Sequence, residues 1–388
     1  MKIVSVIAEF NPFHNGHKRQ IDFIKRELKP DYTIAFMSGN FTQRGEPSIL
    51  DKYARARHAI LSGYDLVVEL PTVFATQNAE IFASGALKLI SSIMCENVLC
   101  FGAECDNISD FYSVANELLC ESDELKAIIK QQLASGVSLI DARDYAFLKL
   151  YPNQKHIISS PNNVLGLEYV KAIIKNNYGV TPIVLKRDGS AYNEGLEVNE
   201  IPSAFGVRNA VANGNLESVK KGVPPYVFND LPSSIKSGDK AIIYSLITKD
   251  KSEIASTLDC SEGLENRIKE ASKKHSKLCD VIDEVKTKRY TISRIKRIIL
   301  STALGITKDS VNLALNSELY LKVLAVNGKK TEVFSELAKT GLPLITKKAD
   351  ESNLTPSAKA VYDKDLYSCD LYGLITEKPI KENFMIIV

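Results

Sequence analysis

The chain has 388 residues, of which 45% are hydrophobic, and carries a formal net charge of +2 at pH 7. This length exceeds one ordinary core, so two domains are expected, and the hydrophobic content is sufficient for both. The near-neutral net charge excludes a protein that is basic over its whole surface, so any surface for nucleic acid must be a local basic patch. No apolar run approaches the ~18 residues of a membrane span, and residues 1–2 lead directly into a predicted strand rather than a signal peptide. We therefore expect a cytoplasmic protein without a membrane partner.

The cysteines indicate reduced thiols rather than a disulfide framework. Their number is odd, seven, and none forms a Cys-x-x-Cys pair. Cys95, Cys100 and Cys105 are evenly spaced, but a spacing of five along a predicted strand directs side chains to alternating faces, and no histidine lies nearby in the sequence. We interpret them as core or incidental thiols and predict no metal site.

The most informative stretch is residues 9–17, Glu-Phe-Asn-Pro-Phe-His-Asn-Gly-His. A short apolar run typical of a buried parallel strand precedes it, and apolar residues at helical spacing follow it. Pro12 blocks an earlier start of the helix, and Gly16 lacks the Cβ that would keep a ligand away from the backbone. The N-terminus of the helix offers free N–H groups and a partial positive charge, so this turn predicts an anion site.

Two histidines flank that glycine. His14 and His17 are three residues apart, so both can face a triphosphate and donate hydrogen bonds to charge that develops on the α-phosphate. The alternative is an ordinary surface or core pair on an amphipathic helix. The order strand, glycine turn and helix favours the phosphate site.

Further strands and helices alternate up to about residue 212. We expect strands at 32–37, 65–70, 97–101 and 181–187, helices at 52–61, 75–93 and 164–175, two or three helices within 108–150, and a helix from 201 to about 212. Candidate ligand-binding residues lie at or after the ends of several strands, where a parallel sheet presents its carboxyl edge to ligands. They are Gln43 and Arg44 in the loop 40–47, Gly102 after the fourth strand, and Arg187 after the fifth. The alternatives are a solvated loop and a simple turn.

Two helix starts carry further candidates. Asn162 lies in Ser-Ser-Pro-Asn-Asn at 159–163, and Ser203 precedes Arg208 by five residues in 201–208. Each polar residue can be a helix cap, which is the commoner role. An arginine one turn into a helix can also neutralise the β- and γ-phosphates of a leaving pyrophosphate.

Proline-rich breaks near 220–238 indicate the domain boundary, and the chain beyond it is predicted to be mainly helical. Residues 286–297 carry six basic groups and one tyrosine, which suggests either a solvated face or an RNA surface. A small strand-helix-strand unit is expected between 320 and 347, with helix again from 358.

The motif at 14–17 resembles the nucleotidyltransferase superfamily shared with class I aminoacyl-tRNA synthetases. Residues 6–17, together with Met-Ser-Gly-Asn-Phe-Thr-Gln-Arg-Gly-Glu-Pro at 37–47, are similar to the bacterial tRNA(Met) cytidine acetate ligase family. The resemblance implies a Rossmann-like α/β HIGH-type domain with a parallel sheet in 1–220, and a mostly helical tRNA-binding domain in 221–388. It implies that ATP is consumed to adenylate acetate, and that the acetyl group passes to the wobble cytidine of elongator tRNA(Met).

The same resemblance assigns roles by position. The residues implied for catalysis are His14, His17 and Arg208, and the tentative acetate or RNA contacts are Gln43 and Arg44. The ATP-binding set is Ile7, Ala8, Glu9, Phe10, Asn11, Pro12, Phe13, His14, Asn15, Gly16, His17, Gln20, Gly102, Asn162, Arg187 and Ser203. The tRNA-binding set is Lys288, Arg289, Arg294 and Arg297.

The sequence departs from the family pattern at Asn193, where a histidine is expected, and at Phe205-Gly206, where smaller residues are expected. Mg²⁺ can accompany ATP, but no dedicated carboxylate cluster is evident. No obligatory protein partner is inferred. Two alternatives stay open: a small-molecule nucleotidyltransferase acting on pantetheine phosphate or nicotinamide mononucleotide, and a non-catalytic ATP-sensing RNA-binding protein.

Overall fold

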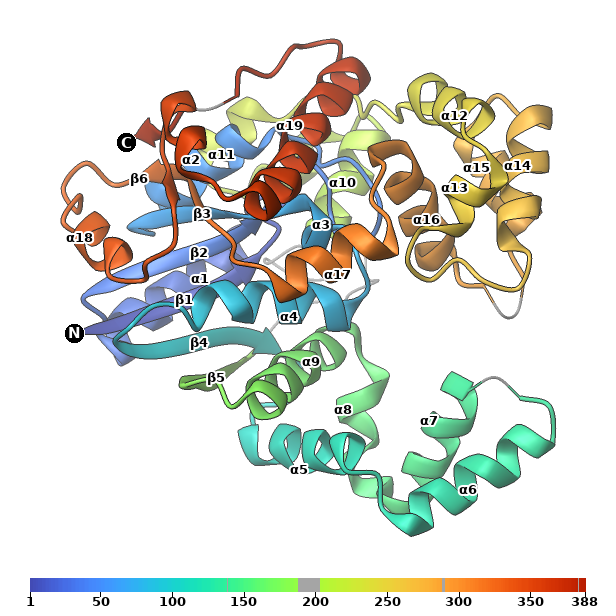
Figure 1. The fold of residues 1–388 in the computed structure, drawn as a ribbon. Helices are drawn as coiled ribbons and strands as arrows, with labels where there is room; N and C mark the ends of the chain where they lie inside the picture. Colours follow the sequence, from blue (N-terminus) through green and yellow to red (C-terminus); the bar gives the residue numbers. More distant parts are fainter. Residues whose placement is uncertain (138, 188–202, 288–289, 383) are drawn as a thin grey trace.

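The computed structural model describes residues 1–137, 139–187, 203–287, 290–382 and 384–388 (Figure 1). Within these residues eight strands form one sheet in the order β5-β4-β1-β2-β3-β6-β7, with β8 paired to β6. The strands are β1 (Lys2–Ala8), β2 (Tyr32–Ser38), β3 (Leu66–Leu70), β4 (Glu96–Ala103), β5 (Val180–Lys186), β6 (Leu321–Val326), β7 (Leu344–Ile345) and β8 (Ile386–Ile387).

The first five strands are parallel, which confirms the predicted Rossmann-like α/β class. The chain proceeds from β1 through β2 to β3 on one side, then returns to add β4 and β5 on the other side of β1. The direction of winding therefore reverses between β1 and β4. In doubly wound sheets this is where ligands bind, beyond the carboxyl ends of the strands.

Alternation along the strands divides the hydrophobic core between the two faces of the sheet. Val4 and Val6 of β1 belong to one buried cluster, whereas Ile3 belongs to the other. Successive side chains of a strand point to opposite faces, and a parallel sheet is covered on both, so its strands are apolar throughout. This burial fixes the carboxyl edge of β1, and with it the position of the motif at 9–17.

Ten helices lie in the first half of the chain among the described residues, and several of them cover the faces of the sheet. They are α1 (Asn15–Phe23), which continues as a π-helical turn (Ile24–Leu28), α2 (Lys52–Ser62), α3 (Thr72–Ala75), α4 (Ala79–Ile90), α5 (Ile108–Leu119), α6 (Asp123–Ala134), α7 (Leu139–Leu150), α8 (Lys155–Ser159), α9 (Pro161–Asn176) and α10 (Ala204–Ala212). The three helices α5–α7 confirm the prediction for 108–150, and they extend below the sheet in Figure 1.

The helix predicted for 75–93 forms as α4 but begins later, at Ala79, and the short helix α3 that precedes it ends at Ala75. Asn78 caps α4, and its Oδ1 accepts a hydrogen bond from the N–H of Ile81 at 3.1 Å. Asparagine is favoured at such N-caps because its side chain satisfies a free N–H group. The break also brings α3 against α4, since a Cβ on Gly85 would lie 2.2 Å from Cγ of Phe74.

The second half is mostly helical, as predicted, but it also extends the sheet. Its helices are α11 (Pro225–Asp230), α12 (Asp239–Thr248), α13 (Lys251–Ala255), α14 (Leu264–Lys274), α15 (Leu278–Val285), α16 (Ile292–Leu304), α17 (Lys308–Asn316), α18 (Val333–Ala338) and α19 (Pro356–Thr376). Helices α12–α16 gather to one side of the sheet (Figure 1).

The predicted boundary near residue 220 does not separate the sheet from the helical part. The expected strand-helix-strand unit forms as β6, α18 and β7, and β6 pairs antiparallel with β3. The edge of β3 would otherwise present unpaired backbone groups. Every residue of β6 is buried, so this strand belongs to the common core.

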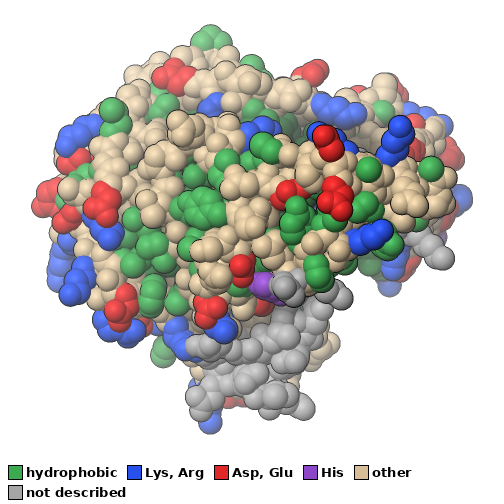
Figure 2. All heavy atoms as spheres, turned by 90° about the horizontal axis from the view of Figure 1, so that it is seen from below, with side chains coloured by type: hydrophobic (Ala, Val, Ile, Leu, Met, Phe, Trp, Pro, Cys, Tyr) green, Lys and Arg blue, Asp and Glu red, His purple; other side chains and the backbone are tan. Residues whose placement is uncertain are grey.

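Charged side chains of both signs are interspersed on the face shown in Figure 2, in keeping with the small net charge. Among the described residues, no single helix is long and apolar enough to cross a bilayer. Helices α16 and α17 meet the criterion only when taken together, and they meet at an angle of 83°.

Candidate active site

A cavity of about 920 Å³ opens at the carboxyl edge of the sheet, at the reversal between β1 and β4. The predicted residues that line it are Ile7, Ala8, Glu9, Phe10, Asn11, His14, Gly16, His17, Gln20, Gln43, Arg44, Gly102, Asn162, Arg187, Ser203 and Arg208. The structure thus brings together residues from six separate stretches of the chain.

Three residues predicted to bind ATP do not line this cavity. Phe13 is fully buried in the core beneath it. Asn15 turns away, and its Nδ2 donates a hydrogen bond to the carbonyl of Lys221 at 2.8 Å. Pro12 is also absent from the wall. These residues shape the turn and join it to the start of the second half.

The two histidines are held by the backbone of their own turn. His14 is the N-cap of α1, and its Nδ1 accepts from the N–H of Gly16 at 3.0 Å. His17 Nδ1 accepts from the N–H of His14 at 3.2 Å, and the two rings stack with centroids 3.8 Å apart. Because each Nδ1 is an acceptor, the proton of each neutral ring lies on Nε2.

Both rings are neutral at physiological pH. Burial, followed by the charges of Arg187 and Arg208, lowers the pKa of His14 to about 3. Burial, followed by His14 and Arg187, also holds the pKa of His17 well below its usual range. The pair therefore presents two Nε2–H donors, and the positive charge of the cavity comes from the arginines.

Arg208 reaches the cavity from the first turns of α10. Ser203 caps this helix by accepting from the N–H of Gly206 at 3.0 Å, so it has the capping role and lies on the cavity wall as well. Nη1 of Arg208 donates to the carbonyl of Asn11 at 2.7 Å. This bond fixes the guanidinium beside the histidine turn.

Arg187 enters from the opposite side, after β5. Its N–H donates to the carbonyl of Ala103 at 2.8 Å, and a Cβ on Gly102 would lie 3.3 Å from its Cγ. Gly102 therefore lets the arginine lie across the end of β4. Asn162 lines the wall beside it and donates to Oε1 of Glu104 at 2.6 Å.

The loop after β2 forms another wall. Glu9 Oε1 accepts from the N–H of Gln43 at 2.8 Å, which links this loop to the end of β1. Sequence reasoning missed the residue beneath it, Arg55, which is fully buried in α2. Its guanidinium donates to the carbonyls of Glu9, Ser38, Gly39 and Leu50. The available signal was an arginine at a core-facing position of that helix.

A second cavity of about 320 Å³ adjoins the first, and both are lined by Arg44, Phe205 and Arg208. Its outer wall includes Ile292 and Lys296 of α16, so the helical second half reaches the mouth of the site.

The predicted tRNA residues lie only partly within the described chain. Lys288 and Arg289 lie outside the described residues, and α16 begins after them, at Ile292. Arg294 donates to the carbonyl of Asp259 at 2.9 and 2.6 Å. Arg297 faces the same residue, with Nη2 3.8 Å from its carboxylate.

Residues 1–385 match the model of the HIGH nucleotidyl transferase family. The chain belongs to this family. It is 36% identical to the tRNA(Met) cytidine acetate ligase of Thermoanaerobacter sp. (strain X514), with 96% of this chain and 95% of the relative aligned. It is 37% identical to the ligase of the same name from Clostridium acetobutylicum, with 89% and 90% aligned.

Two solved structures of Thermotoga maritima TmcAL match over 100% of both chains. The apo form has a TM-score of 0.91 at 28% identity, and the form bound with alpha-thio ATP has a TM-score of 0.88 at 29% identity. These matches, together with the parallel sheet, confirm the expected HIGH-type fold.

The structure describes one of the two departures from the family pattern, Phe205-Gly206, but not the other, Asn193. The backbone N–H of Gly206 is the capping partner of Ser203. Phe205 is 39% exposed and lines both cavities, and the Arg208 guanidinium lies 5.9 Å from the centre of its ring. The larger residue at 205 thus forms part of the wall between the cavities. Asn193 lies outside the described residues.

Proposed function

We propose that this chain is an ATP-dependent ligase that activates acetate as acetyl-adenylate and transfers the acetyl group to the wobble cytidine of elongator tRNA(Met), forming N4-acetylcytidine. The observation that carries this proposal is the neutral histidine pair, with both Nε2–H donors in a cavity that Arg187 and Arg208 also line, in a protein similar over nearly its whole length to ligases of that name.

In the first step an acetate oxygen attacks the α-phosphate of ATP, and the bond to the bridging oxygen of pyrophosphate breaks. Negative charge grows on the α-phosphate oxygens, where His14 and His17 donate hydrogen bonds from Nε2. A neutral donor held rigidly by the backbone stabilises this charge without reorganising. Arg187 and Arg208 neutralise the departing pyrophosphate, while Gln43 and Arg44 hold the carboxylate, which a guanidinium can bind through two hydrogen bonds.

In the second step the exocyclic amine of cytidine attacks the acetyl carbonyl, and AMP leaves. The lone pair of this amine is delocalised into the ring, so it needs an activated acyl donor. We assign the second cavity to the acceptor base, because it joins the ATP cavity at Arg44 and Arg208 and opens toward α16. The exposed ring of Phe205 there offers a stacking face of the kind used for unpaired RNA bases.

ATP is the consumed nucleotide, and we expect Mg²⁺ to arrive on its phosphates rather than in a protein cage. Two carboxylates line the larger cavity among the described residues, Glu9 and Asp22, and Glu9 already accepts a hydrogen bond from Gln43. The partners are then acetate and tRNA(Met), and we place the reaction in the cytoplasm with its tRNA substrate.

The two alternatives have less support. A small-molecule nucleotidyltransferase would leave the second cavity and the long helical half without a role. An ATP sensor without turnover would not require two histidines aligned as Nε2–H donors.

Pyrophosphate exchange tests the reaction class. Labelled pyrophosphate should enter ATP when acetate is supplied, and the assay is run both without RNA and with tRNA, because some synthetases activate their acid only with tRNA bound. No exchange with acetate under either condition, combined with a stable conjugate formed from phosphopantetheine or nicotinamide mononucleotide, would overturn the proposal.

A variant in the second cavity separates the two steps. Ile292→Glu places a negative charge opposite incoming RNA at a position that is already 38% exposed, so folding should be retained. Exchange should stay at the parent rate while acetyl transfer to tRNA falls. Loss of exchange in this variant would contradict the assignment of the second cavity to the acceptor alone.

A further inference from the structure

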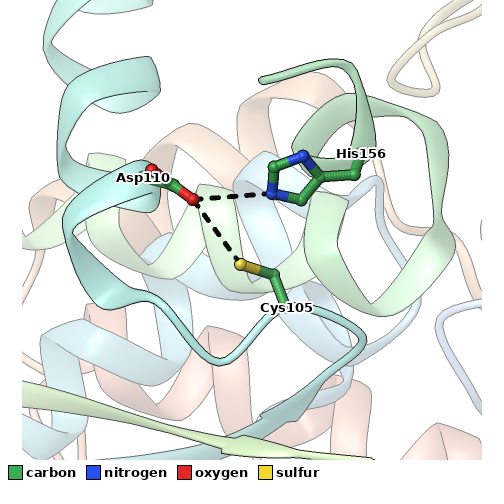
Figure 3. A group of neighbouring side chains, drawn as sticks. All are labelled: Cys105, Asp110 and His156. Carbon is green, nitrogen blue, oxygen red and sulfur yellow. Dashed lines mark hydrogen bonds and ion pairs between the residues drawn. The ribbon is translucent and has the colours of Figure 1, made fainter. Parts of the chain in front are cut away.

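A cluster of three potential metal ligands lies outside the described active site. Cys105 follows β4, Asp110 lies in the first turn of α5, and His156 lies on α8. One ligand atom from each lies within 4.8 Å of the other two. Figure 3 shows the thiol of Cys105 and the ring of His156 both turned toward the carboxylate of Asp110. The cluster was not predicted from the sequence, because only the fold brings His156 to Cys105.

The spacing of these atoms is close to that of ligands that share one metal ion. Sγ of Cys105 lies 3.8 Å from Oδ2 of Asp110, and Nε2 of His156 lies 3.6 Å from the same oxygen. The second distance is too long for a hydrogen bond. Ligands of a tetrahedral Zn²⁺, bound at ~2.0 Å through O or N and ~2.3 Å through S, lie roughly 3.3–3.6 Å apart. Small side-chain shifts would therefore bring all three atoms to coordination distance.

Hydrogen bonds from Asn163 hold the backbone of the ligand residues in place. Oδ1 of Asn163 accepts from the N–H groups of Glu104 and Cys105 at 2.8 and 3.3 Å. Nδ2 of the same asparagine donates to the carbonyl of His156 at 2.8 Å. One buried side chain thus fixes the backbone of two ligands, as the supporting residues of metal sites commonly do.

The donor set also selects the metal. Thiolate and imidazole favour Zn²⁺ over Mg²⁺ or Ca²⁺, which prefer oxygen ligands. One thiolate and one carboxylate together balance the charge of a divalent ion, which matters at a site where the cysteine is buried.

We propose that Cys105, Asp110 and His156 bind one Zn²⁺ ion, with water as the fourth ligand, and thereby join α5 and α8 to the end of β4. The site borders the nucleotide cavity, because Glu104, next to Cys105, accepts from both Ser160 and the cavity residue Asn162. The ion fixes this edge of the cavity. The inference does not depend on the reaction proposed above.

Cobalt substitution provides the test, using the full-length chain freed of metal by a chelator and then dialysed. Titration with Co²⁺ should give a thiolate-to-cobalt charge-transfer band and the visible bands of a tetrahedral ion, saturating at one equivalent. Zn²⁺ should displace the Co²⁺ and raise the melting temperature by about 3 °C when present at about a hundredfold excess over its Kd. The charge-transfer band requires a thiolate, so metal bound only by the histidine pair of the active site would not produce it.

Variants identify the ligands. Cys105→Ser should remove the charge-transfer band, and His156→Gln should weaken Zn²⁺ binding by at least the 10–100-fold that loss of a supporting residue causes. His156 is exposed, so its replacement tests the site even if Cys105→Ser does not fold. Cys120→Ser, which removes an exposed thiol at the end of α5, is the matched control and should bind Co²⁺ as the parent chain does. A missing thiolate band in the parent chain, or Zn²⁺ affinity unchanged in both ligand variants, would overturn the proposal.

Discussion

Two groups of charged side chains in this fold differ in how their charge is compensated: one is buried and paired, and the other lines the cavity without ion pairs among the described residues. In the first, which we call the ion network, Lys52 and Lys322 meet Glu69 and Glu382. Lys52 lies 2.8 Å from Glu69, and Lys322 lies 3.0 Å from each glutamate. Burial opposes ionisation of Glu382, but the two lysines outweigh it and hold the pKa of that carboxyl far below its usual range. The network is therefore charged and internally balanced.

The second group is the cavity with Arg187 and Arg208. Among the residues that the structure describes, neither arginine forms an ion pair with a carboxylate, and burial lowers the pKa of both. The neighbouring histidines stay neutral, so they add no compensation. A partly desolvated cation without an ion-pair partner carries a cost that a bound anion can offset. The comparison indicates that the ion network stabilises the fold, whereas the unbalanced cavity is prepared for phosphates.

The largest effect is expected from unbalancing the ion network. Glu69→Gln leaves two buried lysines facing one carboxylate, so the free energy of unfolding should fall by about 3–5 kcal/mol. Urea unfolding at pH 7 measures this loss. Lys236→Gln, which removes an exposed pair with Glu377, is the control and should change little. A loss in Glu69→Gln no greater than in the control would show that the network does not stabilise the fold.

The next effect should appear in catalysis rather than stability. His17→Ala removes an Nε2–H donor, which should cost about 3 kcal/mol, or roughly a hundredfold in the rate of adenylation. Affinity for ATP should change far less, because the donor acts mainly on charge that develops in the transition state. Single-turnover adenylation and ATP binding are measured side by side.

A second substitution separates the donor from the helix cap. His17→Gln retains an acceptor for the N–H of His14, as glutamine does at this position of a capping box. If the cap alone matters, this variant restores the rate. Equal losses of rate and ATP affinity in His17→Ala would make His17 a binding residue only, and a parental rate would remove it from the site.

The neutral histidines should also make stability depend on pH. The pKa of His14 is lowered from 6.5 to about 3 in the fold. As the pH falls below about 6.5, the unfolded chain gains a proton that the folded chain does not, so stability is full above this pH and declines toward pH 3. The loss from His14 should reach about 2 kcal/mol at pH 5.

Comparison of unfolding at pH 8 and pH 5 checks this sign and size. The loss of stability between the two pH values should be about 2 kcal/mol smaller in His14→Gln than in the parent chain. An unchanged loss would mean that His14 titrates in the folded cavity, and the neutral-donor description would then be wrong.

The sequence predicts those parts of the site that follow from local order. A strand, a glycine turn and a helix place His14 and His17 at the edge of the sheet. Burial of the strand on both faces fixes the position of its carboxyl end, and therefore of the turn that follows. Arg187 and Arg208 are also found, since each follows a recognisable strand or helix start.

Contacts between distant segments were not predictable in this way. Arg55, the ion network and the cluster at Cys105 each depend on residues that only the tertiary fold brings together. Glu69 and Lys322 meet because β6 returns antiparallel to β3, and the helical pattern of the second half does not indicate that pairing. The start of α4 at Ala79 was not predicted, because the small residues within 75–93 indicated one continuous helix and the capping role of Asn78 was not considered.

The smallest expected effect concerns Arg294, which has local hydrogen-bond partners and belongs neither to the ion network nor to the lining of the cavity. Arg294 already donates to the carbonyl of Asp259 and to Oγ of Ser261, yet we predict that it also contacts RNA phosphate. Arg294→Gln should lower the log–log salt slope of tRNA binding by ~0.7–0.9, the value for one phosphate contact, while acetate-dependent exchange stays intact. Arg267→Gln on α14, where the arginine likewise donates to a carbonyl, is the matched control and should leave the slope unchanged. If neither variant alters the slope, Arg294 only supports the turn at Asp259; if both alter it equally, the RNA surface extends over α14 rather than centring on α16.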